Sequence, residues 1–225
     1  MWLGVFGVSV NALLTRAIGI RSDSFPRRLV RDGLVAEHRL VGYPNVLYTL
    51  TREGHNIAET LMHRKVRLIR GDRLSTSQLS HDLMTQAAVL DSLEGMAERS
   101  SAGLDLEVFL RHARESKDLN AIDQAVRPDL LFERDGRGLS FELEAHPKAS
   151  TAIRDKLEML VRYSSRFKSL TVFWAIRAAG TDTMERYREI FEEVLEAAHI
   201  GGVPRQELCR LKCIFTPATR IHGVR

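Results

Sequence analysis

The 225-residue sequence predicts a mixed α/β protein of two domains: a small N-terminal one of helices and a β-hairpin, then an α/β/α domain with a mixed sheet. Positive charge is concentrated near the N-terminus, because residues 1–80 contain 12 Lys and Arg against 6 Asp and Glu, whereas the other 145 contain 21 against 23. A Gly-Asp pair and a Ser-Thr-Ser run within 71–77 interrupt two helical patterns. Beyond that run, short apolar segments alternate with amphipathic ones, which is typical of a sheet covered by helices. We therefore expect domains at 1–72 and 73–225.

The first elements are two short helices. Apolar residues at helical spacing predict an amphipathic helix over Val8–Ile18, which Gly19 would end. Ser22 is a suitable N-cap for a second helix, in which Pro26 is tolerated because it lies in the first turn. An Asp-Gly pair that ends with Gly33 would stop this second helix.

Two strand-like runs follow, Leu34–Val41 and Val46–Leu50, and a helix is expected over His55–Ile69. A helix, a turn, a helix and a hairpin are the layout of a winged helix-turn-helix module, whose second helix normally enters the major groove of DNA. This part of the chain resembles winged-helix domains of bacterial regulators and mobile-element proteins, and dimerisation or protein contact is the alternative use of such a module. Four arginines are the expected DNA-phosphate contacts: Arg27, Arg28, Arg31 and Arg39.

The second domain is predicted to begin with a helix and to contain three strands before the next helix. The near-continuous apolar run Val172–Ile176 indicates a strand that is buried on both faces. The expected helices are Gln78–Glu98, Ala149–Phe167 and Thr183–His199, and the expected strands are Leu106–Arg111, Asp129–Glu133, Leu139–His146, Leu170–Ile176 and Leu211–Thr216.

The most informative segment is a predicted hairpin that carries three acidic residues. Asp129 opens its first strand, and Asp135-Gly136 supplies the turn. On the return strand, Glu142 and Glu144 share one face because side chains alternate along a strand. Three carboxylates would then converge, and oxygen ligands of this kind suit Mg²⁺ or Mn²⁺. The alternative is that the two glutamates form only the solvated side of a strand.

The order of elements and the acids on the second and third strands resemble the PD-(D/E)XK nuclease superfamily. Asp129, after Pro128, is similar to its first motif half, and Glu142 occupies the (D/E) position. Glu144 stands where that superfamily has its lysine. The resemblance implies that a lysine from the following helix replaces it, with Lys156 preferred over Lys148.

The whole chain, with a Ser-His-Asp-Leu run at 80–83, resembles the replication-relaxation family and MOBC-type relaxases of plasmids and integrative elements. That resemblance implies an origin-binding, metal-dependent nicking enzyme that acts in mobilisation or replication. Asp129, Glu142 and Glu144 would hold the cation, and Lys156 would stabilise charge. His81 or Asp82 would complete the site, although packing or helix capping is the other role for His81.

Two other functions are compatible with the sequence. A non-catalytic DNA-binding accessory protein or transcriptional regulator with a degenerate nuclease fold would explain the displaced lysine. A winged-helix repressor with a ligand-sensing domain is the third interpretation, but the sequence contains no phosphate-binding loop. The expected partners are double-stranded DNA, a second copy of the chain and other mobilisation proteins, with no membrane.

The remaining features indicate a cytoplasmic protein. The apolar start at Met1 has no basic segment before it, so we interpret it as part of a buried helix and not as a signal peptide. Cys209 and Cys213 have no second pair of cysteines, which argues against a disulfide framework or a zinc ribbon.

Overall fold

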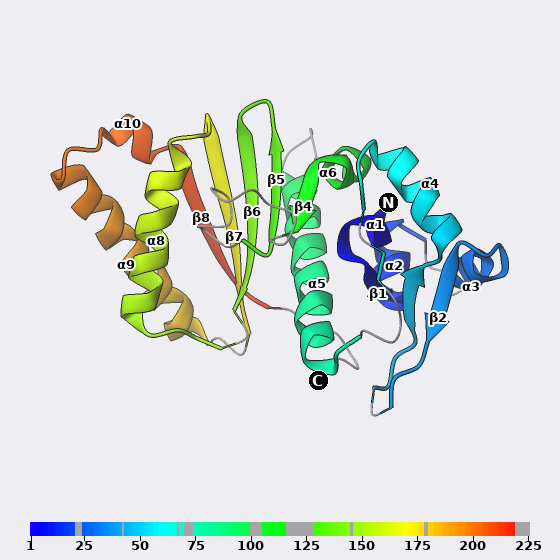
Figure 1. The fold of residues 1–225 in the computed structure, drawn as a ribbon. Helices are drawn as coiled ribbons and strands as arrows, with labels where there is room; N and C mark the ends of the chain where they lie inside the picture. The colour runs from blue at the N-terminus through cyan, green and yellow to red at the C-terminus, as the bar shows by residue number, and fades with distance from the viewer. Residues whose placement is uncertain are drawn as a thin grey trace. The chain divides into compact units, whose positions relative to one another are not determined.

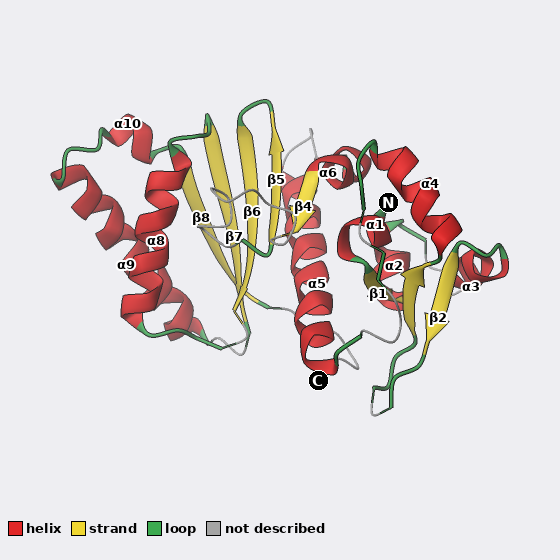
Figure 2. Cartoon of the chain, viewed as in Figure 1, coloured by secondary structure: helices red, strands yellow, loops and turns green. Residues whose placement is uncertain are grey.

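The computed structural model describes residues 1–20, 24–41, 43–66, 68–69, 74–99, 105–115, 128–144, 146–177 and 180–218. They form two compact units, the first made chiefly of Met1–His112 and the second of Ala113–Thr219. Each unit has one β-sheet together with helices (Figures 1 and 2), so the chain is a mixed α/β protein, as predicted. Within the described ranges, no helix is both long enough and apolar enough to cross a membrane.

The first unit is built around a three-stranded antiparallel sheet of order β1-β3-β2. It opens with α1 (Trp2–Phe6), in which every residue is buried. The strands are β1 (Val8–Val10), β2 (Val35–His38) and β3 (Leu47–Leu50). The other helices are α2 (Asn11–Ala17), α3 (Ser24–Arg31), α4 (Arg52–Met62), α5 (Thr76–Arg99) and α6 (Leu106–His112).

Two predicted helices differ from those in the structure. The single helix expected over Val8–Ile18 is wrong, because its first three residues form β1 and pair with β3, and only α2 follows. The helix expected over His55–Ile69 begins earlier, since Thr51 caps α4 by accepting a hydrogen bond from the Gly54 amide at 3.1 Å. It ends at Met62, after which His63 adopts the left-handed conformation. Ser22, the predicted N-cap of the second helix, lies outside the described residues.

Helix α5 packs in the first unit, although the sequence assigned it to the second domain. Its Gln86 side chain is fully buried, and its amide oxygen accepts hydrogen bonds from Trp2 Nε1 at 2.9 Å and Ser9 Oγ at 2.6 Å. The Gln86 amide nitrogen donates to the Val8 carbonyl at 2.7 Å. These long-range bonds satisfy the polar groups that α1 and β1 bury against this helix.

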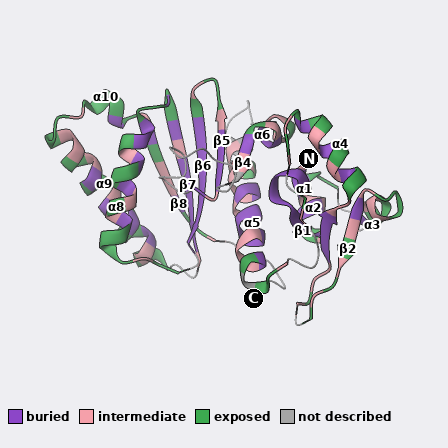
Figure 3. Cartoon of the chain, in the orientation of Figure 1, coloured by how far each residue is buried: buried purple, intermediate pink, exposed green. Residues whose placement is uncertain are grey.

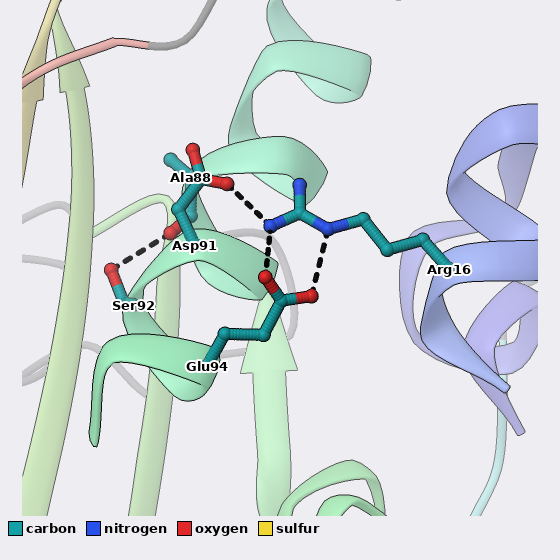
Figure 4. Close-up of polar contacts among 5 residues, drawn as sticks. All are labelled: Arg16, Ala88, Asp91, Ser92 and Glu94. Carbon is teal, nitrogen blue, oxygen red and sulfur yellow. Dashed lines mark hydrogen bonds and ion pairs between the residues drawn. The ribbon is translucent and has the colours of Figure 1, made fainter. Parts of the chain in front are cut away.

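A second polar contact joins α5 to α2 (Figure 4). Arg16 donates to Glu94 through two parallel hydrogen bonds, Nε to Oε1 at 2.8 Å and Nη2 to Oε2 at 2.6 Å. Its Nη2 also donates to Asp91 Oδ1 at 2.5 Å. The hydrogen bond with Glu94 raises the pKa of Arg16, so this guanidinium is charged at any ordinary pH. Helix α2 is thus attached to α5 by a forked ion pair as well as by apolar packing.

The second unit contains a five-stranded mixed sheet of order β4-β5-β6-β7-β8. The first three strands are antiparallel, and the last three are parallel to one another. The strands are β4 (Ala113–Glu115), β5 (Leu130–Arg134), β6 (Arg137–Glu144), β7 (Ser169–Ile176) and β8 (Leu211–Pro217). The helices are α8 (Ser150–Ser164), α9 (Thr181–Ile200) and α10 (Arg205–Leu208).

The turn chemistry of this unit explains one confirmed prediction and one error. The predicted hairpin joins β5 to β6, and its two turn residues, Asp135 and Gly136, have φ of 53° and 78°, as a tight hairpin turn requires. The strand predicted over Leu106–Arg111 is wrong, because this segment forms α6. Asp105 starts that helix by accepting a hydrogen bond from the Glu107 amide at 2.7 Å.

One face of the mixed sheet packs against both α8 and α9. Alternate residues of β7 point into this core, and Trp174 at its centre is fully buried beside Tyr187 of α9, with their rings edge-on at 5.6 Å. Figure 3 shows that β6 and β7 are buried along most of their length. The other main members of this core are Ile153, Leu157, Leu160, Tyr163, Phe167, Leu170, Val172, Ile176, Met184, Ile190, Val194, Leu211 and Phe215.

Candidate functional site

The β5–β6 hairpin places three carboxylates on one face of the sheet. The Asp129 amide donates to the Phe141 carbonyl at 3.0 Å, so Asp129 lies opposite Glu142 in the antiparallel register. Glu144 follows two residues later on the same face of β6. This is the face that packs against α8 and α9, because Glu142 is level with Trp174 in the parallel register. The acidic cluster is therefore turned toward a helix-covered side of the sheet.

Glu142 is the most deeply buried of the three acids, with 4% of its surface exposed. Its Oε2 contacts Lys156 Nζ, and its Oε1 lies 3.4 Å from Ser140 Oγ. Burial raises the pKa of Glu142 to about 8, and the charge of Asp129 adds to this effect, whereas Lys156 opposes it. A carboxyl in this position is costly to ionise unless a positive charge is nearby.

Lys156 reaches Glu142 from α8. Its side chain is 13% exposed, and its Nζ lies 5.4 Å from the centroid of the Trp174 ring, an arrangement that favours a cation. Burial acts most strongly against its charge, but the charge and hydrogen bond of Glu142, together with the charges of Glu144 and Asp129, outweigh burial, and the pKa of Lys156 is raised. Lys156 is therefore protonated at neutral pH.

Glu144 is held differently, by a second lysine and by an indole. Its Oε1 accepts a hydrogen bond from Trp174 Nε1 at 3.2 Å and pairs with Lys148 Nζ at 2.6 Å. The backbone amide of Lys148 in turn donates to Tyr187 Oη at 3.0 Å. Thus the two glutamates of β6 each face a lysine, Lys156 for Glu142 and Lys148 for Glu144.

Asp129 is the most accessible member of the cluster and has a positioning bond of its own. Its Oδ2 accepts a hydrogen bond from the Leu143 amide at 2.6 Å, which joins the segment before β5 to the C-terminal end of β6. This bond fixes the carboxylate beside Glu142, since Leu143 is the next residue along β6.

The donor chemistry fits a hard divalent cation at two residues. Among the described residues, no group of three or more His, Cys, Asp and Glu side chains is arranged to hold a metal ion. Asp129 and Glu142 face each other across the hairpin and raise each other's energy by repulsion, which a doubly charged ion would relieve. Glu144 has one oxygen engaged by both Trp174 and Lys148, and so fits a ligand role less well.

His81 and Asp82 were predicted to complete this cluster. Both lie on α5 in the first unit, whereas the cluster described above is made entirely of second-unit residues. His81 Nδ1 is 3.8 Å from Asp82 Oδ1, and the His81 carbonyl accepts a hydrogen bond from Thr85 Oγ1 at 3.0 Å. Helix α5 begins at Thr76, so His81 lies in its second turn and does not cap it.

The predicted DNA contacts form an exposed basic stripe on the first unit. Arg27, Arg28 and Arg31 are exposed, and their spacing places them on a single face of α3. Arg39 is exposed just beyond β2, and its guanidinium lies 3.6 Å from Glu37. Arg31 Nε lies at the same 3.6 Å from Asp32. Such long, exposed ion pairs hold these arginines only weakly, so they can exchange their partners for phosphates.

Sequence reasoning missed the aromatic groups that support the acidic cluster. Trp174 and Tyr187 read as core residues of a strand and a helix, and no local pattern shows which carboxylate either one meets. Only the parallel register of β6 with β7 places Trp174 level with Glu142 and next to Glu144. Comparisons of this chain with protein-family models, with curated proteins and with solved structures each found no match.

Proposed function

We propose that this chain is a DNA-binding, divalent-metal-dependent phosphodiesterase, a nuclease or relaxase-like nickase that acts on DNA of a plasmid or mobile element. The observation that carries the proposal is the meeting of Asp129, Glu142 and Lys156 on one face of a mixed sheet. Two acids and a lysine in that arrangement supply the groups that metal-assisted phosphoryl hydrolysis needs. The element order β4-β5-β6-α8-β7 around them supports the PD-(D/E)XK resemblance.

The first unit supports DNA binding. Its order of elements, in which a short helix and strand precede α2, α3 and the β2–β3 hairpin, is compatible with a winged helix-turn-helix module and supports this part of the proposal. The arginine stripe on α3 would then lie toward the groove, and Arg39 of the hairpin would contact the backbone. These cations supply affinity and register, whereas base contacts would supply sequence preference.

The chemistry assigned to each residue follows from its surroundings. Asp129 and Glu142 would hold the cation. When bound, the cation would offset the negative charge on a phosphate oxygen and lower the pKa of a bound water molecule. Lys156 keeps its proton beside them and offsets the negative charge that develops on the pentavalent phosphorus. The Leu143 amide holds the Asp129 carboxylate beside Glu142, the residue that precedes Leu143 on β6.

A cleavage assay tests the proposal without knowledge of the target sequence. Supercoiled plasmid and single-stranded DNA are incubated with the full chain and Mn²⁺ or Mg²⁺, with EDTA as the metal-free arm. We expect metal-dependent scission that is lost in Asp129→Asn and Glu142→Gln, both of which replace a carboxyl group that could bind the cation by an amide of nearly the same shape. Asp155→Asn, an exposed acid on α8, is the matched control and should cut normally.

The pairing of each glutamate with a lysine favours a second candidate function. If Lys156 and Lys148 neutralise the cluster permanently, the second unit is a non-catalytic support, and the chain is a DNA-binding accessory protein. Tight DNA binding without scission under any metal, together with equal heats of Mn²⁺ binding for wild type and Glu142→Gln, would exclude the enzyme and favour this candidate.

A further inference from the structure

Lys148 is fixed at both ends. Its ammonium pairs with Glu144 Oε1 at 2.6 Å, and its backbone amide donates to Tyr187 Oη at 3.0 Å. Both partners are buried, Glu144 on β6 and Tyr187 on α9, and both contact Trp174. A half-exposed lysine normally samples many rotamers, and holding it in place costs side-chain entropy. The surroundings of Lys148 remove that freedom before any ligand arrives.

The side chain of Lys148 is also partly exposed to solvent. Its side chain is 40% exposed, whereas that of Glu144 is 9% exposed. An ammonium has three donor hydrogens, and Glu144 engages it through one oxygen. A cation whose only purpose was to neutralise Glu144 would be as effective when buried, as Lys156 is beside Glu142. Lys148 therefore combines a fixed position with a side chain that is partly exposed and an ammonium that has donor hydrogens beyond the one that Glu144 Oε1 accepts.

The place of Lys148 in the chain brings it next to the proposed catalytic cluster. Glu144 is two residues beyond Glu142 on the same face of β6, so the two lysine–glutamate pairs stand side by side along that strand. An anion bound at Asp129 and Glu142 would therefore lie near Lys148, the partner of the next glutamate on this face of β6. The sequence resemblance had given Glu144 a metal-ligand role, but its Oε1 is already shared between an indole and an ammonium.

We propose that Lys148 binds a phosphate oxygen of the nucleic acid that occupies the cluster, and that Glu144 and Tyr187 position this lysine. Glu144 is then a positioning residue and not a ligand of the cation. The inference rests on the proposed function, because it takes the nucleic acid backbone as the ligand. It goes beyond that function because it assigns a further phosphate contact in the second unit to Lys148, whose partners Glu144 and Tyr187 both contact Trp174.

The first test counts phosphate contacts in the full chain with EDTA present, so that no strand is cut. The salt dependence of binding to a labelled duplex is measured for wild type, Lys148→Met and Lys148→Arg. Each phosphate contact contributes about 0.9 to the slope of log affinity against log salt for duplex DNA. We expect Lys148→Met to lower the slope by about 0.9 and Lys148→Arg to retain it. Lys168 is an exposed lysine beside the opposite end of β6, so Lys168→Met is the control and should leave the slope unchanged.

Glu144→Gln separates positioning from general charge effects. Removing a negative charge near bound DNA would by itself strengthen binding, whereas loss of a positioning residue weakens it and lowers the slope. We expect the weaker binding, and we expect the Glu144→Gln/Lys148→Met double variant to be no worse than Lys148→Met. Tighter binding by Glu144→Gln, or an unchanged slope for Lys148→Met, overturns the inference.

A calorimetric titration with Mn²⁺ distinguishes this inference from the proposed function. We expect Glu144→Gln to bind Mn²⁺ within threefold of wild type and Glu142→Gln to lose binding. Loss of binding in both variants would make Glu144 a ligand and overturn the inference alone. If wild type binds DNA but neither binds Mn²⁺ nor cuts, the proposed catalysis fails, and the salt slope still decides the role of Lys148. If wild type binds no DNA at low salt, both fail.

Discussion

Glu142 makes the protein less stable as pH rises, and Glu142→Gln should remove that dependence. The pKa of this acid is raised from 4.5 to about 8 by burial, so the folded protein holds its proton between those pH values and the unfolded chain releases it. Stability is therefore greatest below about pH 4.5 for this group, falls through the window, and is constant above about 8. A shift of this size corresponds to about 5 kcal/mol at 1.36 kcal/mol for each pKa unit.

That figure is an upper limit, because water entry and side-chain movement reduce the cost of a buried charge. The groups that face Glu142 are Asp129 before β5, Glu144 on the same strand, Lys156 on α8 and Cys213 on β8, whose pKa burial raises. Lys156 has a raised pKa, so its stabilising charge is present throughout the window and is lost only at higher pH. We therefore expect at least about 2 kcal/mol of the dependence to be measurable.

The assay is urea unfolding of the full chain in EDTA at pH 5 and pH 8.5. The stability of Glu142→Gln relative to wild type should rise by about 2–5 kcal/mol between the two pH values. Glu158→Gln, an exposed acid on α8 that pairs with Arg162 at 3.7 Å, is the matched control and should show no such change. Equal pH dependence of stability for wild type and Glu142→Gln would mean that Lys156 fully compensates the buried carboxylate of Glu142, and that burial does not destabilise its charged form.

Three further predictions concern the first unit. Gln86→Met should lower the free energy of unfolding by about 3 kcal/mol or more, because it leaves two buried donors and a buried carbonyl without their partner. Urea titration measures this loss, and Gln206→Met, at an exposed position, is the control and should change stability by less than about 0.5 kcal/mol. Gly54→Ala should lower the free energy of unfolding by about 2–3 kcal/mol, since its new Cβ would lie 1.9 Å from a backbone oxygen of the turn before β2. Thermal unfolding measures this loss, and Gly180→Ala, whose Cβ would meet nothing within 4 Å, is the control and should lose less than about 1 kcal/mol. Arg28→Ala should lower the salt slope of duplex binding by about 0.9, and an unchanged slope would remove α3 from the DNA interface.

Local signals predicted the second unit well. The hairpin followed from Asp135-Gly136, which tolerate positive φ, and β7 followed from an apolar run too short for a helix. Apart from the short helix α10, which was not predicted, the order of strands and helices from β5 to β8 also matches the sequence prediction to within a few residues. These elements are determined by patterns within a few residues of one another, so a single sequence contains the necessary information.

The errors arose where distant contacts decide the structure. Val8–Val10 fits a helical pattern, but pairing with β3 makes it a strand. The Leu106–Arg111 segment is short and mostly apolar, as a strand can be, yet the Asp105 cap and the Glu107–Arg111 ion pair at 2.6 Å support a helix. Helix α5 was assigned to the wrong side of the expected boundary because the partners of Gln86 lie near the N-terminus.

The acidic site was predicted in the same uneven way. Asp129, Glu142 and Glu144 share a face because of strand alternation, and the helical position of Lys156 brought it to Glu142. The support from Trp174 and Tyr187 depends on parallel register and helix packing, which leave no mark in the local sequence. The spacing of residues could therefore identify the charged groups but not the aromatic side chains that orient them.

The hydrogen bonds of Gln86 determine where this chain can be divided for experiments on its N-terminal part. A fragment that stopped at residue 72, the boundary expected from the sequence, would expose the apolar surface of α1 and leave the Trp2 indole and the Ser9 hydroxyl without an acceptor. Such a fragment should aggregate when expressed alone. A fragment that extends to His112 keeps α5 and the hydrogen bonds of Gln86, and is therefore the N-terminal fragment to test for independent folding.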